Sequence, residues 1–228
     1  MRVPHFTTPL IAVFLFGLSC QSSLEYVPTV RAATSVVNEY SVDMSLSVFG
    51  LALNASEDLD SADETMFAIG GKLVDSSSGA VNGLVEVVFS SPSVDSSALD
   101  FEYASANMGF ESSRIAVGGR YYTDDARDLS PFLSTYIVMD DITATVTDDI
   151  TYAGMTIFER GDSEDIGLQV GLSLGIGLEK AISENGFFDV SFSHLSALQD
   201  AASAVDGVSH EYSSIAGWTL NIGVGYSF

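Results

Sequence analysis

Apolar and polar residues alternate along most of the chain after residue 38, and this alternation predicts β-strands. In the last segment, WTLNIGVGYSF (218–228), apolar residues occupy every even position, whereas the odd positions carry Gly, Ser, Thr or Asn. A period of two places the two sets on opposite faces of an extended strand. An apolar face that begins and ends with aromatics, opposite small polar residues, is typical of a strand between lipid and a narrow polar interior. A strand of a soluble β-sandwich shows the same alternation. The other segments of the chain must therefore distinguish a membrane barrel from a soluble sandwich.

The longest alternating segment is DIGLQVGLSLGIGLEKAI (165–182), in which seven apolar residues alternate strictly, mostly with Gly and Ser. This segment is somewhat longer than the ~9–11 residues of a tilted transmembrane strand. The same pattern recurs at 40–48, 67–73, 81–89, 115–121, 131–139 and 188–192. With the two segments above, the pattern predicts eight strands. Segment 131–139 is apolar on both faces, so its inward face is not assigned.

The connections between these segments are of two kinds, as an up-and-down barrel requires. Short turns are predicted at 75–80, 123–130 and 183–186, and long acidic loops at 54–65, 91–111, 140–164 and 197–214. We expect the turns in the periplasm and the loops outside the cell. Residues 99–106 resemble a further strand, but an odd number would place Phe228 on the wrong side, so we interpret them as a rigid part of the second loop. The predicted fold is all-β, an eight-stranded antiparallel up-and-down transmembrane β-barrel over residues 38–228.

The N-terminal residues 1–20 are predicted to be a secretory signal, because Arg2 precedes an apolar run that is followed by small residues. That run is about half the ~20 residues of a membrane-spanning helix. Cys20 is the only cysteine, so a disulfide within the chain is excluded. It follows Gly17-Leu18-Ser19, which is similar to a weak lipobox, so Cys20 is either lost near the cleavage site or lipidated. Residues 21–37 show no period and are predicted to be a periplasmic tether.

The charge of the chain limits its partners. With 31 acidic and 8 basic residues, the formal net charge is −23, so binding of nucleic acid is not expected. Cations, basic proteins and neutral groups are compatible partners. No cofactor is predicted and no dedicated metal site, because the acidic loops lack the D-x-D-x-D-G spacing of a calcium loop. Loose binding of calcium or magnesium, bridging to lipopolysaccharide phosphates, is the alternative interpretation of the acidic loops.

Some of the charged residues are predicted to point into the barrel. The inward positions of the alternation include Asp43, Lys72, Glu86, Arg114, Arg120, Glu179 and Asp189. Because unpaired buried charge is costly, we expect a paired, water-poor network. The lumen of an eight-stranded barrel is only wide enough for side chains, so this network is expected to plug it. A narrow, low-conductance pore is the alternative, and a general porin is not expected.

The sequence resembles the OmpA-like small outer-membrane β-barrels of Gram-negative bacteria over residues 38–228. The resemblance rests on GGRYYTDDARDLSPF (118–132), on VGLSLGIGLEKAISENGFFDVSFS (170–193) and on the terminal GYSF. It implies the bacterial outer membrane as location, with outer-membrane lipid and lipopolysaccharide around the barrel. It also implies that Trp218, Tyr226 and Phe228 form a C-terminal signal for the outer-membrane assembly machinery. Members of this family serve as anchors, adhesins, immune-evasion proteins and enzymes, so the fold alone does not give the function.

One catalytic arrangement is conceivable. His194 and Ser196 share the outward parity of the strand at 188–192, near the outer rim, and Glu211 follows before the last strand. A Ser activated by His, which is oriented by Glu, can cleave an ester. This arrangement resembles the His-x-Ser and later Glu of lipid A deacylases, but Ala197 stands where that family has Asn, and the Glu spacing differs. We therefore predict a non-enzymatic monomer that has a structural role or recognises a surface ligand through its acidic loops, and keep the deacylase as the alternative.

Overall fold

The computed structural model describes the backbone of residues 24–48, 51–60, 64–101, 104–123, 129–152, 155–199, 201–205 and 208–228. Its side chains are described over narrower ranges, which leave out those of 42–60, 94–106 and 201–215 in particular. Within this part of the chain, no helix is long and apolar enough to cross a membrane. The predicted signal, Cys20 and residues 21–23 lie outside the described residues.

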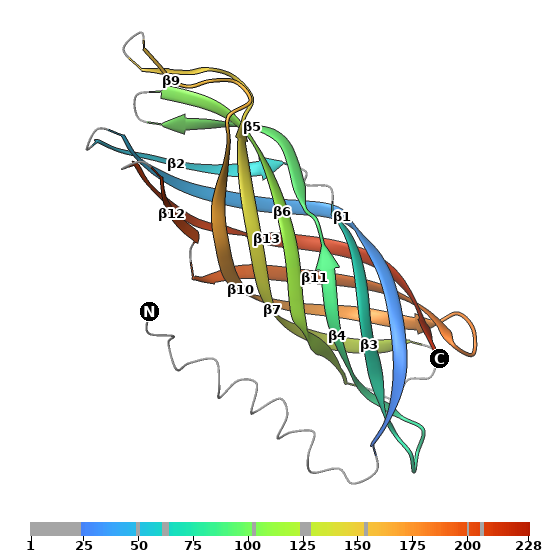
Figure 1. Ribbon diagram of the computed structural model, residues 1–228. Coiled ribbons are helices and arrows are strands. Elements are labelled where there is room, and N and C mark those ends of the chain that lie inside the picture. The colour runs from blue at the N-terminus through green and yellow to red at the C-terminus, as the bar shows by residue number, and fades with distance from the viewer. Residues whose placement is uncertain are drawn as a thin grey trace, which may run out of the picture.

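Eight antiparallel strands, each paired with the next, close into a ring (Figure 1), which confirms the predicted fold. Strand β13 returns to β1 over a long register that runs from Thr29↔Ser227 to Leu46↔His210, so the sheet has no free edge at the barrel level. The ring strands are β1 (Leu24–Val48), β3 (Thr65–Asp75), β4 (Val81–Ser90), β6 (Ala104–Tyr122), β7 (Ser130–Val146), β10 (Ser163–Ala181), β11 (Gly186–Gln199) and β13 (Val208–Ser227).

The prediction that residues 21–37 are a tether is wrong for residues 24–37, because they form the first half of strand β1. They pair with β3 from Leu24↔Asp75 to Thr34↔Thr65 and with β13 on the other side. Arg31 and Ala33 are buried on the inward face. The alternation is hard to see in the sequence because Ala occupies both faces and because a register shift between Ser35 and Val37 reverses the phase. The barrel therefore begins well before residue 38.

The outward face of the ring carries an apolar band. On β10, Leu168 to Leu178 point outward at every second residue, and Leu168, Leu174 and Ile176 are more than half exposed. Ten residue steps of about 3.3 Å, tilted by about 45°, span about 23 Å, close to the ~25 Å band of outer-membrane barrels. Exposed charged residues flank the band, with Lys180 at one end and Asp141, the register partner of Leu168, at the other. Exposed hydrophobic residues thus form the lipid-facing surface.

Above this band the hydrophobic pattern reverses. On β7, Leu133 is exposed within the band, whereas farther along the strand Ile142, Ala144 and Val146 are buried and Asp141 is exposed. On β6, Met108 and Phe110 are buried in the same way. Water replaces lipid outside the band, so apolar residues turn inward there. The reversal marks the outer membrane surface.

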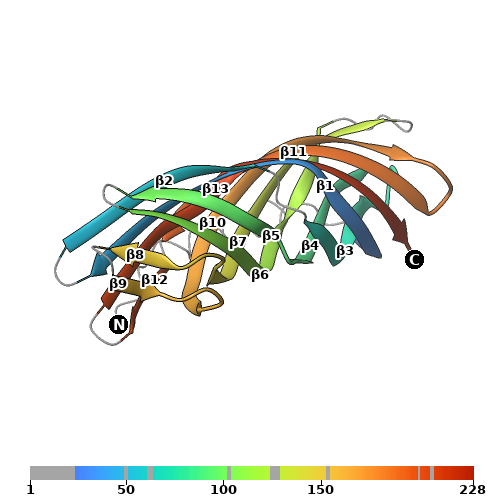
Figure 2. The same cartoon turned by 90° about the horizontal axis from the view of Figure 1, so that it is seen from above.

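The strands continue above the membrane into a β-structured extension, which we call the head. It contains β2 (Leu51–Asp60), β5 (Ser93–Phe101), the β8–β9 hairpin (Ile150–Tyr152 and Met155–Phe158) and β12 (Ala201–Val205), together with the outer ends of five ring strands. The head has two four-stranded sheets, β12-β13-β1-β2 and β5-β6-β7-β10. Strand β2 lies against β5, and β12 lies against β10 (Figure 2). Residues 99–106 were predicted to be a rigid part of a loop, but residues 99–101 of β5 pair with residues 104–106 of β6, so β5 is a further strand that does not join the ring of eight.

Candidate functional site in the barrel lumen

Three cations and three anions form a buried cluster at mid-barrel, which we call the inner cluster. Its members are Arg31, Lys72, Arg120, Glu86, Glu179 and Asp189, and each comes from a different strand. Arg120 lies at its centre, with Nη2 3.0 Å from Asp189 Oδ1 and with Glu86 and Glu179 at 3.7 and 3.8 Å. Arg31 Nη2 donates to Glu86 Oε1 at 2.8 Å, and Lys72 Nζ lies 2.6 Å from Glu179 Oε1. The cluster is electrically balanced, as buried charge requires.

Two tyrosines add hydrogen bonds to the inner cluster. Tyr136 Oη donates to Glu86 Oε1 at 2.6 Å, and Tyr122 Oη donates to Glu179 Oε2 at 2.6 Å. Lys72 also lies over the Phe187 ring, 3.9 Å from its centroid. Neutral donors and a ring face therefore add to the ion pairs, although Nε and Nη1 of Arg120 and Oδ2 of Asp189 are buried without a hydrogen-bond partner.

Glycines provide the room for this cluster. A Cβ on Gly70 would meet the Val85 carbonyl oxygen and the backbone of its register partner Glu86. A Cβ on Gly223 would lie 2.6 Å from Asp189 Oδ2. Small residues on one strand thus face large charged residues on the next, which explains why the inward positions of the sequence are so rich in Gly and Ser.

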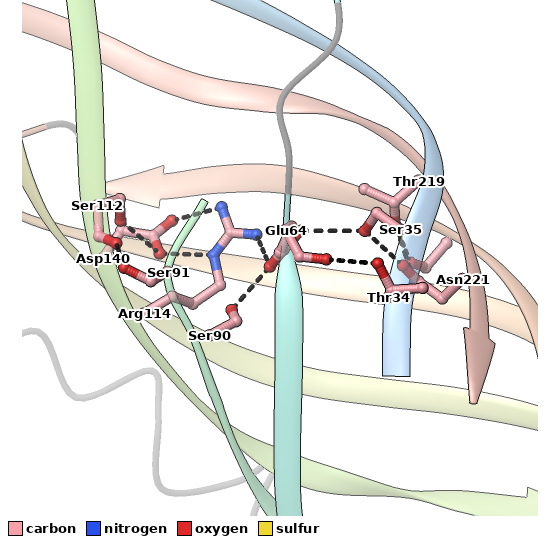
Figure 3. A network of polar contacts seen from close by, with 11 residues as sticks. Thr34, Ser35, Glu64, Ser90, Ser91, Ser112, Arg114, Asp140, Thr219 and Asn221 are labelled. Carbon is pink, nitrogen blue, oxygen red and sulfur yellow. Dashed lines mark hydrogen bonds and ion pairs between the residues drawn. The ribbon is translucent and has the colours of Figure 1, made fainter. Parts of the chain in front are cut away.

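A second cluster, the outer cluster, lies toward the head (Figure 3). Arg114 binds Asp140 through two bonds, Nε to Oδ1 at 2.6 Å and Nη2 to Oδ2 at 3.1 Å. Arg114 Nη1 also donates to Glu64 Oε1 at 3.1 Å. Glu64 Oε1 accepts from Ser90 Oγ at 2.7 Å, and the Glu64 backbone oxygen accepts from the Ser35 N–H at 2.9 Å. Glu64 therefore ties β1, β4 and β6 together across the lumen.

A cavity of about 80 Å³ lies between the two clusters. Arg31 and Arg120 line it on the inner side, and Glu64 and Arg114 on the outer side. One wall is apolar and the other is rich in hydroxyl and amide groups. The polar wall is formed by Ser173, Ser191, Ser193, Thr219 and Asn221. This volume is well above the roughly 10–15 Å³ that one water molecule needs, so the cavity has room for several water molecules.

Buried apolar residues lie toward both ends of the described lumen. On the periplasmic side, Leu84, Phe132 and Phe187 are each 1 to 2% exposed. On the outer side lie the buried head residues of β6 and β7, including Phe110 and Ile142. Charged and apolar layers thus alternate along the axis of the described lumen.

The structure places the predicted lumen residues at two levels. Lys72, Glu86, Arg120, Glu179 and Asp189 lie in the inner cluster, whereas Arg114 lies in the outer one. The Asp43 backbone pairs with Ser213 and Ser56 in the head, and its side chain is outside the described part.

Sequence reasoning missed three members of these clusters. Arg31 was assigned to the tether, and Glu64 and Asp140 were assigned to outer loops. Asp140 shares its parity with Phe132, Ser134 and Val138, all buried, but a segment apolar on both faces does not reveal its inward side. Nothing in the sequence distinguishes Glu64 from the other residues of its acidic run. Only the folded chain shows that its side chain points into the lumen.

The catalytic candidates are brought together only in part. Ser196 Oγ and His194 Nδ1 are 3.1 Å apart on the outward face of β11, and the His194 ring lies 4.3 Å from that of Trp218. Glu211 is outside the described side chains, but its position on β13 is known. Glu211 precedes Trp218 by seven residues on this strand, and Trp218 is the register partner of His194. Seven residues correspond to about 23 Å along a strand. A Glu side chain is too short to cross that distance, so the predicted triad with Glu211 is not formed.

The predicted assembly residues Trp218 and Tyr226 lie on the outward face of β13, and Phe228 follows directly after its last residue. Trp218 stacks on Phe192 with ring centroids 4.9 Å apart, and Tyr226 contacts Phe228 edge to face at 5.2 Å. The Phe228 N–H donates to the Pro28 carbonyl at 2.9 Å, which joins the last residue to β1. Among the described residues, no group of three or more His, Cys, Asp and Glu side chains is placed to hold a metal ion.

Comparisons with known proteins show the fold and nothing more. No protein-family profile and no curated protein sequence matches the chain. The outer membrane protease OmpT from Escherichia coli has a TM-score of 0.56 at 8% identity, over 91% of this chain and 100% of that one. Neisserial surface protein A scores 0.46 at 13% identity, over 88% and 97% of the two chains. Ail of Yersinia pestis scores 0.40 at 14%, over 90% and 100%. The fold is that of the β-barrels of the bacterial outer membrane.

Proposed function

We propose that this chain is a bacterial outer-membrane protein that anchors a rigid β head at the cell surface, where the head serves recognition, and that its lumen is not a transport route. The observation that carries the proposal is the continuation of five ring strands beyond the apolar band into a two-sheet head, above a lumen filled by two ion-pair clusters. A barrel that served transport would need a continuous wet lumen.

The surface of the head favours a cationic partner. The exposed charged residues of its described part are acidic apart from Arg160. They are Glu39, Glu111, Asp141, Asp148, Asp149, Glu159 and Asp162. A field of one sign attracts partners of the opposite sign, so a basic surface protein or peptide is the ligand class that fits. Divalent cations that bridge to lipopolysaccharide phosphates are compatible with the same charges.

The remaining partners follow from the location. Outer-membrane lipid and lipopolysaccharide surround the apolar band, and Trp218, Tyr226 and Phe228 are the residues that we expect the assembly machinery to bind. The closed ring needs no second copy to satisfy its edges, so we propose a monomer.

An epitope inserted between β8 and β9 tests the surface display. We expect antibody to label it on intact cells, and labelling only after the outer membrane is permeabilised would contradict the proposal. A variant with Glu111, Asp141, Asp148 and Asp149 changed to Gln or Asn should bind an oligolysine probe more weakly while still inserting. Unchanged binding would mean that these acidic residues of the head do not take part in recognition.

A second candidate is an outer-leaflet esterase such as a lipid A deacylase, which the 3.1 Å contact between Ser196 and His194 favours. Without an acid in reach of His194 among the described side chains, we rank it second. Lipid A from cells that express the Ser196→Ala variant should match that of the parent if the protein is not an enzyme. A loss of one acyl chain that occurs with the parent and not with the variant would establish the enzyme.

A further inference from the structure

A pair of polar side chains interrupts the lipid-facing surface of β11. The outward residues of this strand are apolar from Phe188 to Phe192, and His194 and Ser196 then take the next two outward positions. Leu198 follows on the same strand and is 62% exposed. On β10 the register partners of both polar residues are leucines, and the outward face stays apolar for two further positions toward the head. The polar pair therefore lies within the outer part of the apolar band, below its edge.

Aromatic rings hold this pair on one side. Ser196 Oγ lies 3.1 Å from His194 Nδ1, and the His194 ring lies 4.3 Å from the ring of Trp218. Trp218 in turn stacks on Phe192 with an angle of 8° between the ring planes. His194 is half-buried, whereas Ser196 and Trp218 are exposed on the lipid-facing surface. The site therefore combines a flat aromatic surface with a polar pair that a lipid molecule can reach.

The polar pair has a hydrogen-bond donor to spare. His194 Nδ1 either accepts a hydrogen bond from the Ser196 hydroxyl or donates one to it. In the first case the N–H at Nε2 is left over, and in the second case the O–H of Ser196 is left over. Among the described residues, no second hydrogen bond of either side chain is found. Hydrocarbon chains offer no acceptor, and an unsatisfied polar group among them is costly. An acceptor that belongs to the lipid itself is therefore the partner that fits this position.

We propose that His194, Ser196 and Trp218 form a binding site for one lipid molecule of the outer leaflet. The polar pair donates a hydrogen bond to an acyl ester carbonyl of this lipid, and an acyl chain lies against the rings of Trp218 and Phe192. Ester carbonyls lie at the boundary between headgroups and hydrocarbon, which is the depth of the pair, whereas phosphate groups lie farther out. Binding does not require cleavage of the ester, so the site is independent of the esterase considered above. It also goes beyond the display function, for which lipid needs only to surround the barrel.

The fluorescence of Trp218, the only tryptophan, tests the site directly. The chain without the predicted signal is refolded into vesicles that mix diester phosphatidylcholine with its diether analogue, which lacks the carbonyl groups. Bromine atoms on the chains of one of the two lipids at a time quench Trp218 when that lipid lies beside it. We expect the association constant at Trp218 to be about fivefold higher for the diester than for the diether, the ratio that one net hydrogen bond gives. Equal association constants would overturn the proposal.

Added lipopolysaccharide distinguishes two natural sources of the ester. Relief of the quenching by brominated diester lipid would identify lipopolysaccharide as the occupant. A preference for the diester that lipopolysaccharide does not change would identify a glycerophospholipid. Either result supports a site for an acyl ester.

The double variant His194→Leu with Ser196→Ala removes both possible donors, so it should bind the two lipids equally. Both changes place apolar groups on a lipid-facing surface, so the variant should still insert. Thr135→Val is the matched control, because Thr135 is an outward residue of β7 on the other side of Leu174, the register partner of His194. It removes a hydroxyl from the same band away from the site and should keep the preference for the diester. A preference that persists in the double variant, or one that is lost in Thr135→Val, would contradict the site.

Discussion

Arg31 and Glu86 are bonded across an intervening strand, with Arg31 Nη2 2.8 Å and Nε 3.3 Å from the two carboxylate oxygens of Glu86. Arg31 lies on β1 and Glu86 on β4, and the bond passes over Gly70 of β3, the register partner of Glu86. Both side chains are almost completely buried. The pair therefore fixes three consecutive strands of the ring, including the segment that sequence reasoning assigned to a tether.

Removal of one partner of this pair should be strongly destabilising. We expect Arg31→Met to lower the free energy of unfolding by about 3–5 kcal/mol, because it leaves the Glu86 charge without its forked donor. Urea titration in lipid vesicles, followed by the fluorescence of Trp218, the only tryptophan, measures the loss. The double variant Arg31→Met with Glu86→Gln should lose less than Arg31→Met alone. A double variant less stable than Arg31→Met would contradict the pairing.

Residues 24–37 should be indispensable for the barrel. Deletion of this segment removes the register of β1 with β3 and half of that with β13, and two unpaired edges in lipid are too costly for a stable ring. We expect the truncated chain to lose the compact unheated band that a closed barrel shows on a gel. Retention of a heat-modifiable band would mean that residues 24–37 are a tether after all.

Gly118 should not tolerate a side chain. A Cβ there would collide with the Thr135 carbonyl oxygen and the Tyr136 backbone on the neighbouring strand. We expect Gly118→Ala to reduce the yield of folded barrel in a refolding assay or to lower its unfolding midpoint. The control is Gly79→Asn in the β3–β4 turn, where φ is +72° and nothing lies near the added Cβ. Asn tolerates that conformation, so this variant should fold like the parent. Equal folding yields and unfolding midpoints for the two variants would contradict the close approach of β7 to Gly118.

A charge on the lipid-facing surface should cost more in the middle of the apolar band than at its edge. Leu174→Arg, near the middle of the outward residues of β10, should cost about 2–4 kcal/mol, and Asp141→Arg, at the outer edge, about 0–1 kcal/mol. The same urea titration in vesicles compares the two. Similar costs at both positions would mean that the band does not lie in lipid as assigned.

The strands of the barrel were predictable because lipid on one side and a narrow lumen on the other impose a strict period of two. β10 shows this best, with Gly, Ser and Gln opposite Leu and Ile throughout. The alternation of apolar and polar residues did not predict the structure correctly at positions where the apolar residues change from one face of the strand to the other. The register shift near Val36 hid the first half of β1, and the reversal on β7 near Asp140 hid the inward face of that strand.

The lumen clusters were only partly predictable. The alternation of a strand shows which side chains point into the barrel, but it does not show at which level along the barrel axis two inward side chains come into contact. Lys72 and Glu179 have the right parity, but their contact at 2.6 Å depends on a separation of 107 residues that only the ring closes. Glu64 shows the limit most clearly, since an acidic run at the cell surface and a single buried carboxylate look alike in the sequence.

Conductance across a planar bilayer tests the closed lumen most directly. We expect the refolded chain without the predicted signal to insert, as shown by a heat-modifiable band from the same preparation, and to give no steady open-channel current in either polarity. Glu64→Gln should give none either, because Glu64 is not part of the inner cluster, which stays in place. A stable, ohmic, single-channel current from the unmodified protein would contradict the closed lumen and make the narrow pore its function.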